Sequence, residues 1–269
     1  QYTTLQNFIG AELNVSQEDL SDGSVEGAAD ILLLTAPEDF GERELFAVDQ
    51  FLMKGGTVIA STSHFKTSYA NRSLTMVPND SGLDDWFAHN GINIEKQLVM
   101  DPQNSAFPAP VTRNIGGFQI QEMRMLDYPY FPDIRGSALN SSNLITSELP
   151  QLTMAWASPI IIDNEMNKNR VVTKLLQSSE KSWVPDSLDI LPRITGQGVS
   201  AFMPRGKRES HLLGVIIEGR FESYFAGRNP PKAAVETPDE GPTDSTTDTP
   251  LELDNVVDHS PDIARIILF

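Results

Sequence analysis

Apolar residues in the first hundred positions follow two patterns, short continuous runs and longer segments at helical spacing. The run Ile31–Leu34 is typical of a strand buried on both faces of a sheet. From Glu42 to Met53 apolar residues recur three and four positions apart, which predicts an amphipathic helix. Gly55-Gly56 is expected to end that helix, and Thr57–Ala60 predicts the next buried strand.

A second helix and a further strand continue this order. Ser81 with Asp84 is a capping pair for a short helix that ends at Gly91, and Ile94–Met100 predicts a strand. Strands that alternate with helices indicate a parallel sheet with right-handed crossovers. We therefore expect an α/β fold, a mostly parallel sheet flanked by helices.

The second half of the chain is richer in strand patterns. Candidate strands from about residue 144 onward are 152–156, 171–176, 212–218 and 221–225. We expect residues 1–150 to form the α/β domain. Residues 151–269 are expected to complete the same sheet or to form a strand-rich subdomain.

A composition break interrupts this second half at residues 229–255. Pro, Thr, Ser and Asp dominate it, and between Lys232 and Arg265 the sequence has nine acidic residues and neither Lys nor Arg. Such a segment cannot bury enough apolar surface to order itself, so we expect a disordered acidic insertion. A functional acidic arm is the alternative. Apolar residues return at 264–269, which predicts a closing core strand.

The charge balance narrows the classes of partner. The 269 residues include 20 Lys and Arg against 37 Asp and Glu, a formal net charge of −17. Binding to nucleic-acid phosphates requires dense Lys and Arg patches, which this sequence lacks. The acidic balance also argues against electrostatic docking on anionic lipid. We expect no nucleic-acid partner.

Missing residue types and missing motifs exclude several kinds of site. The chain has no cysteine, which excludes disulfides, thiolate catalysis and Cys-based zinc sites. It has neither a GxxxxGK[ST] nor a GxGxxG motif, and its four histidines lack metal-binding spacing. We therefore expect no nucleotide, metal or other cofactor.

The two ends of the sequence suggest a piece of a longer chain. It begins at Gln1 rather than Met, and it stops on the apolar run Ile266–Phe269. We interpret it as a truncated domain, so its lack of a leader or a membrane helix is not expected to hold for the parent protein.

The order of elements from Asp30 to His64 resembles that of class I glutamine amidotransferase-like domains, which implies a flavodoxin-like α/β fold. In those domains a strand leads into a G-x-C-x-G elbow that exposes a nucleophilic cysteine. Here Ala60 stands at the first glycine, Thr62 at the nucleophile and His64 at the second glycine. All three chemically required positions differ, so the resemblance implies a degenerate, inactive elbow, and we expect no enzyme.

Two alternatives involve the same loop, Ser61-Thr62-Ser63-His64. It follows a predicted parallel strand, at the sheet edge where open α/β sheets bind ligands. A cryptic Ser/Thr hydrolase would use one of the three hydroxyls with a histidine base, for which His89 and His211 are further candidates. A polar loop whose hydroxyls cap neighbouring backbone is the simpler interpretation.

The second alternative is a ligand-binding module for a glycan or a peptide. It would combine the Ser61–His64 loop with the aromatic, proline-broken turn that contains Tyr128, Tyr130 and Phe131.

Several segments together resemble one family, the extracytoplasmic domain of the auxiliary component of ABC-type transport systems linked to gliding motility. The resemblance follows the chain in order and matches residues 102–150 poorly. Its segments are Ala29–Pro37 with Leu45–Leu52 and Lys54–Ile59, Leu83–Gly91 with Val99-Met100-Asp101, Gln177–Trp183, Gly214–Phe225, and Ser260–Ile267.

The resemblance implies a place and a role. It implies a periplasmic, or otherwise extracytoplasmic, domain of a bacterial inner-membrane protein, held by membrane segments outside this sequence. It also implies a permease and an ATPase subunit as partners, with the nucleotide site on the ATPase. The family supplies no catalytic residues to carry over. We therefore expect a non-enzymatic accessory or binding domain of an ABC transport system.

Overall fold

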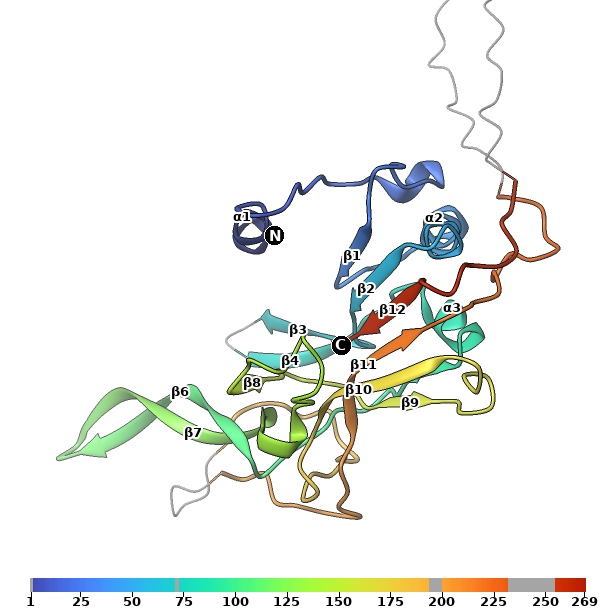
Figure 1. The fold of residues 1–269 in the computed structure, drawn as a ribbon. Coiled ribbons are helices and arrows are strands. Elements are labelled where there is room, and N and C mark those ends of the chain that lie inside the picture. The colour runs from blue at the N-terminus through green and yellow to red at the C-terminus, as the bar shows by residue number, and fades with distance from the viewer. Residues whose placement is uncertain (1, 71–72, 194–199, 232–254) are drawn as a thin grey trace, which may run out of the picture.

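The computed structural model describes residues 2–70, 73–193, 200–231 and 255–269. Its largest sheet contains five strands in the order β1-β2-β12-β11-β10 (Figure 1). These strands are β1 (Ile31–Thr35), β2 (Thr57–Ser61), β10 (Val171–Gln177), β11 (Leu212–Glu218) and β12 (Arg265–Leu268). The pairs β1–β2 and β2–β12 are parallel, whereas β12–β11 and β11–β10 are antiparallel.

The remaining strands form three small antiparallel sheets. They are β3 (Phe65–Ala70) with β4 (Ser73–Pro78), β5 (Ile92–Ile94) with β9 (Ile160–Ile162), and β6 (Asn104–Ile115) with β7 (Phe118–Arg135) and β8 (Gln151–Thr153).

Helices are few and short among the described residues. They are α1 (Thr3–Ile9), α2 (Glu42–Met53), α3 (Asp84–His89) and two 3₁₀ turns, Leu20–Asp22 and Gly136–Ala138. α1 buries none of its residues, whereas α2 is buried along its last nine residues against the five-stranded sheet.

The expectation of a mostly parallel sheet flanked by helices, in a class I glutamine amidotransferase-like (flavodoxin-like) fold, is therefore wrong. The protein is strand-rich, and its sheets are small and mostly antiparallel. The β1–α2–β2 unit forms where the pattern placed it. The segment 94–100 does not add a third parallel strand, because only Ile92–Ile94 becomes a strand and it pairs antiparallel with β9. The second neighbour of β2 is instead β12, from the far end of the sequence.

The second half also differs in detail from its pattern. β8, β10, β11 and β12 lie at or near predicted strands. The segment 221–225 does not form a strand, because it contains only an isolated bridge from Glu222 to His259 and the start of a turn. The division at residue 150 stays a prediction. Residues 232–254 of the expected acidic insertion lie outside the described residues.

Three apolar clusters hold these elements together. The largest fills the space between the main sheet, α2 and α3. A second lies around Leu176, Leu213 and Ile267. A third is aromatic and contains Tyr128 and Trp183, both nearly inaccessible to solvent.

One buried polar network joins α2 to distant segments. The Asp49 carboxylate accepts hydrogen bonds from Trp86 Nε1 (3.1 Å), the Ser223 hydroxyl (2.6 Å) and the Tyr224 N–H (3.0 Å). The next residue, Gln50, accepts from Val257 N–H (2.7 Å). A buried carboxylate is tolerated when its oxygens are hydrogen bonded, and here these bonds fix α2 against three parts of the chain.

Candidate functional site

The Ser61–His64 loop leaves the main sheet where the parallel strands β1 and β2 end together. Ala36, directly after β1, donates its N–H to the Ser61 carbonyl (2.8 Å), and Thr62 donates to the Phe269 carbonyl (3.3 Å). The chain then turns into β3 at Phe65. Ala60 is fully buried below the loop. The sequence placed this loop correctly at the carboxyl end of a strand.

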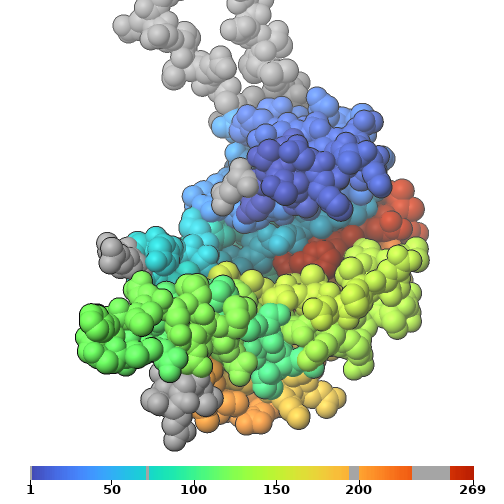
Figure 2. Space-filling model, turned by 90° about the vertical axis from the view of Figure 1, so that its left-hand side faces the viewer, coloured from blue at the N-terminus to red at the C-terminus, as the bar shows by residue number. Residues whose placement is uncertain are grey.

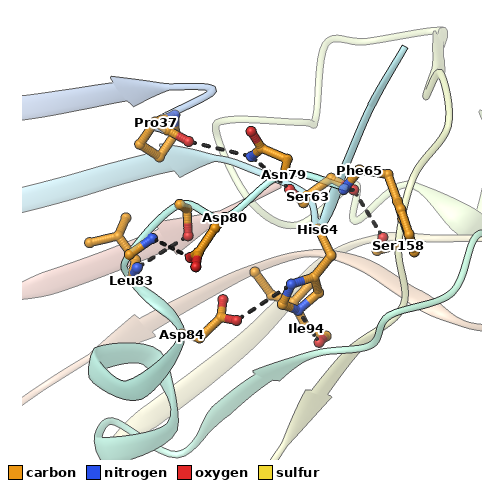
Figure 3. A network of polar contacts seen from close by, with 12 residues as sticks. Pro37, Ser63, His64, Phe65, Asn79, Asp80, Leu83, Asp84, Ile94 and Ser158 are labelled. Atoms are coloured by element: carbon orange, nitrogen blue, oxygen red, sulfur yellow. Dashed lines mark hydrogen bonds and ion pairs between the residues drawn. The ribbon is translucent and has the colours of Figure 1, made fainter. Parts of the chain in front are cut away.

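The Ser63 hydroxyl is hydrogen bonded to neighbouring groups of the protein (Figure 3). Its oxygen lies 3.1 Å from the Ser158 hydroxyl and accepts the Phe65 N–H (3.2 Å). The Ser63 carbonyl accepts from the side-chain amide of Asn79 (3.1 Å), which also donates to the Pro37 carbonyl (3.4 Å). These bonds tie the loop to Asn79, directly after β4, and to the segment after β1.

His64 is held between two oxygens. Its Nε2 lies 2.9 Å from the Ile94 carbonyl, and its Nδ1 lies 3.4 Å from Oδ2 of Asp84 at the start of α3. The imidazole side chain is 11 % exposed. Neither ring nitrogen is bonded to a hydroxyl in the described part of the chain, so this arrangement lacks the nucleophile–base contact of a serine hydrolase.

The other two candidate bases also lie elsewhere. His89 Nε2 contacts the Glu222 carbonyl (3.0 Å), and its ring packs edge-on against Tyr224. Burial lowers the pKa of His211, whose Nε2 is buried without a hydrogen-bond partner among the described residues. Thr62 Oγ1 is likewise buried and unpartnered there.

A cleft of about 550 Å³ opens beside His64. Carboxylates dominate its polar lining, and two of its lining residues, Lys66 and Glu38, form an ion pair (2.6 Å). The lining residues are Glu38, Asp39, His64, Phe65, Lys66, Pro78, Asn79, Asp80, Asp84 and Lys96.

Sequence reasoning did not bring these partners together. The sequence pattern assigns Asp84 only to a helix cap and gives no signal at Asn79. Asn79 contacts Ser63 and Asp84 contacts His64. The β3–β4 hairpin and the turn before α3 bring them there, and the pattern of apolar residues predicts neither. The expected capping pair does not form. The N-cap residue of α3 is Leu83, which makes no side-chain cap, and Ser81 Oγ accepts the Leu83 N–H (3.2 Å) within the turn before the helix.

The predicted aromatic residues are mainly core. Tyr128 and Tyr130 are at most 1 % exposed, and their hydroxyls donate to the carbonyls of Ile190 (2.6 Å) and Ser187 (3.2 Å). Burial raises the pKa of Tyr130 to about 12, and burial also raises the pKa of Tyr128. The ring of Phe131 packs edge-on against that of Tyr128. The rings therefore do not form an open ligand surface.

The aromatic cluster nevertheless lies next to the loop. Phe65, the residue after His64, packs against this cluster. Ser158, the partner of Ser63, lies two residues after Trp156, whose indole N–H donates to the Tyr128 hydroxyl (3.2 Å). The two predicted parts of the binding site are thus neighbours, but the aromatic part supports the loop from inside.

Two further features concern residues 2–70, 73–193, 200–231 and 255–269. These residues contain no group of three or more His, Asp or Glu side chains placed to hold a metal ion. No helix among them is long and apolar enough to cross a membrane.

Two sequence segments that carried the family resemblance meet in the structure. The Asp101 carboxylate accepts the N–H (2.6 Å) and the hydroxyl (2.7 Å) of Ser179, and Met100 pairs with Trp183 through backbone hydrogen bonds. Asp101 is fully buried. These motif residues join two distant parts of the chain, which is a structural role.

Comparison with known proteins identifies the family. A search of curated proteins and a search of solved structures each found no match. The family model described as an ABC-type uncharacterized transport system matches residues 2–251, most of the chain. The chain therefore belongs to the family of auxiliary components of ABC-type uncharacterized transport systems.

Proposed function

We propose that the protein is a non-enzymatic accessory domain that acts outside the cytoplasmic membrane, beside the permease and ATPase subunits of an ABC transport system. Its membership in the auxiliary-component family, over residues 2–251, carries this proposal. The proposed partners, the extracytoplasmic position and the gliding-motility connection come from the finer resemblance described above.

The geometry of the Ser61–His64 loop supports a non-enzymatic role. The Ser63 hydroxyl and both nitrogens of His64 contact groups that position the loop. A nucleophile and its base would have to leave these contacts and meet each other before acyl transfer could begin.

The proposal is tested by co-purification. The full-length parent protein is tagged, native membranes are solubilised gently, and the proteins retained are identified. An unrelated tagged inner-membrane protein from the same cells is the control. Recovery of an ABC permease and ATPase in near-stoichiometric amounts, and not with the control, is expected. Recovery of the parent protein alone would contradict the proposal.

A fluorophosphonate probe tests the non-enzymatic part separately. The folded domain is expected to remain unlabelled. Labelling that disappears when Ser61, Ser63 or Thr62 is replaced by Ala would instead assign a hydrolase to this loop.

The acidic cleft favours a second candidate, a binding module for a small polar ligand. Lys96 and His64 face it together with the carboxylates of Asp80 and Asp84, so it offers both donors and acceptors. The test adds chitotetraose and, separately, tetraglycine, and follows amide shifts by NMR. Saturable shifts confined to residues 78–84 and 94–96 would support this function, and shifts unchanged in Lys96→Ala would contradict it.

A further inference from the structure

The β6–β7 hairpin extends from the body as a two-stranded arm (Figures 1 and 2). Its strands pair without a register shift from Ala106 opposite Asp127 to Ile115 opposite Phe118. Gly116-Gly117 forms the two-residue turn, and both glycines have positive φ (59° and 87°), as a type I′ turn requires. The register of this β6–β7 arm is therefore well defined.

The turn and two prolines fix which backbone groups point outward. A tight turn closes on a hydrogen-bonded pair, here Ile115 and Phe118, and such pairs recur at every second position. Pro108 and Pro110, which lack an N–H, lie on the intervening positions, in agreement with this phase. The β7 residues whose backbone groups point away from β6 are then Gln119, Gln121, Met123 and Met125.

The two edges of the arm are not equivalent. The β6 edge carries the two prolines, which block pairing with another strand. The β7 edge has no proline before Pro129. β8 pairs only with Asp133–Arg135, and no other described strand pairs with this edge between Phe118 and Leu126. One edge is thus protected and the other is open.

The open edge also carries exposed apolar side chains. Phe118 is 76 % exposed, and Met123 and Met125 are each 66 % exposed. A two-stranded hairpin is marginally stable by itself in water, whereas three or more strands with an apolar face are stable. The unpaired backbone edge and the exposed apolar side chains both favour the addition of strands on the β7 side.

We propose that this edge pairs antiparallel with the same edge of a second copy of the chain, with the two-fold axis at the Met123 pair. The product is a four-stranded sheet in the order β6-β7-β7-β6, an isologous interface. The proposal rests on the arm alone and is independent of the proposed function.

Charge complementarity selects the second copy and the register. With the axis at Met123, Glu122 lies opposite Arg124 of the second copy, and the symmetry repeats this pair. Opposite charges placed directly across two strands stabilise their pairing, and like charges destabilise it. The segment thus carries both charges of the pair, so a second copy of the same segment is complementary to it.

Neighbouring registers lose this match. An axis at Glu122 places that residue opposite its own copy, and an axis at Arg124 does the same for two arginines. An axis at Gln121 places the two charged residues opposite uncharged Ile120 and Phe118. Axes between residues are excluded because outward-pointing groups would face inward-pointing ones.

Single cysteines test this register cleanly, because the chain has no cysteine of its own. In Met123→Cys the two Cα atoms lie about 5.5 Å apart in the proposed pair, within disulfide reach. In Gln121→Cys or Met125→Cys alone they lie about 14 Å apart. All three positions share one face of the arm, so the two outer variants are matched controls.

The expected result of mild oxidation is a covalent dimer of Met123→Cys, at least about tenfold more abundant than with either control variant. A mixture of Gln121→Cys and Met125→Cys is also expected to cross-link, because these positions face each other. Equal cross-linking in every preparation, or none in both the Met123→Cys sample and the mixture, overturns the proposal.

Charge reversal provides a second test that needs no disulfide. Glu122→Arg and Arg124→Glu each place like charges across the interface twice, so dimers of each are expected to be at least about tenfold weaker by sedimentation equilibrium. Mixing the two variants restores opposite charges and is expected to give a heterodimer. Circular dichroism confirms that each variant is folded. Unchanged self-association of both variants, or a monomeric wild-type chain, overturns the proposal.

Discussion

Asp49 shows at the scale of a residue how one buried group fixes several segments. Asp49→Ala would leave Trp86 Nε1, the Ser223 hydroxyl and the Tyr224 N–H without their acceptor. We expect a loss of about 3 to 5 kcal/mol in the free energy of unfolding, measured with urea. Asp85→Ala removes an exposed carboxylate at the start of α3 and is expected to cost less than about 1 kcal/mol. Similar losses in the free energy of unfolding for the two variants would contradict the role of Asp49 as a shared buried acceptor.

His211 makes a prediction about pH. Burial lowers the pKa of this imidazole in the folded state, so the unfolded chain binds its proton more readily. The stability that neutral His211 contributes is present above its unfolded pKa of about 6.5 and is lost as the pH falls towards the folded value.

The measurement is the free energy of unfolding between pH 5 and pH 7.5, compared for wild type and His211→Gln. The slope against pH is expected to be shallower in His211→Gln. His259→Gln is the control, because that side chain is exposed. A slope that His211→Gln leaves unchanged would contradict the prediction.

At the scale of an element, the turn before α3 depends on a close approach of two backbones. Gly82 has φ of 74°, and a Cβ there would collide with the backbone of Phe40. The same contact region contains the hydrogen bond from Asp39 N–H to the Asp80 carbonyl (2.8 Å). Gly82→Ala is expected to lower the free energy of unfolding by at least about 2 kcal/mol.

Gly27→Ala is the matched control for this substitution. Gly27 does not have a positive φ, and a Cβ there would meet no described atom within 4 Å. We expect its stability to change by less than about 1 kcal/mol. Because His64 contacts Asp84 directly after this turn, Gly82→Ala is also expected to shift the His64 ring resonances in NMR spectra. A Gly82→Ala protein as stable as Gly27→Ala would contradict the close packing.

The elements also show what the sequence could predict. β1 and β2 are short continuous apolar runs, α2 has apolar residues at helical spacing, and Gly55-Gly56 marks the stop between α2 and β2, so local physics was sufficient to place them. The order of the sheet was not predictable, because β12 joins β2 across some two hundred residues and the pattern does not encode that pairing. The candidate site divides in the same way. The Ser61–His64 loop was located by its strand, but its partners Asn79, Asp84 and Ser158 come from other elements.

At the scale of the whole molecule, the formal charge of −17 leaves many acidic residues without a basic counterpart. Ion pairs between described residues, such as Lys66–Glu38 and Arg265–Glu218, are largely exposed. Exposed pairs contribute little to stability, whereas a large net charge repels itself throughout the folded chain. We therefore expect that added salt stabilises the folded chain, because it weakens the repulsion among like charges more than the attraction within ion pairs.

The prediction is that the melting temperature rises when NaCl is increased from about 10 mM to about 150 mM, as the screening length falls from about 30 Å to about 8 Å. A variant with Glu12→Gln, Glu148→Gln and Asp262→Asn lowers the charge magnitude from 17 to 14, since −17 + 3 = −14, and changes only exposed side chains. Its salt response is expected to be smaller than that of the wild type, because the self-repulsion grows with the square of the charge. A melting temperature that falls with salt in both proteins would contradict the prediction. It would show that attraction within ion pairs outweighs the repulsion among the excess acidic residues.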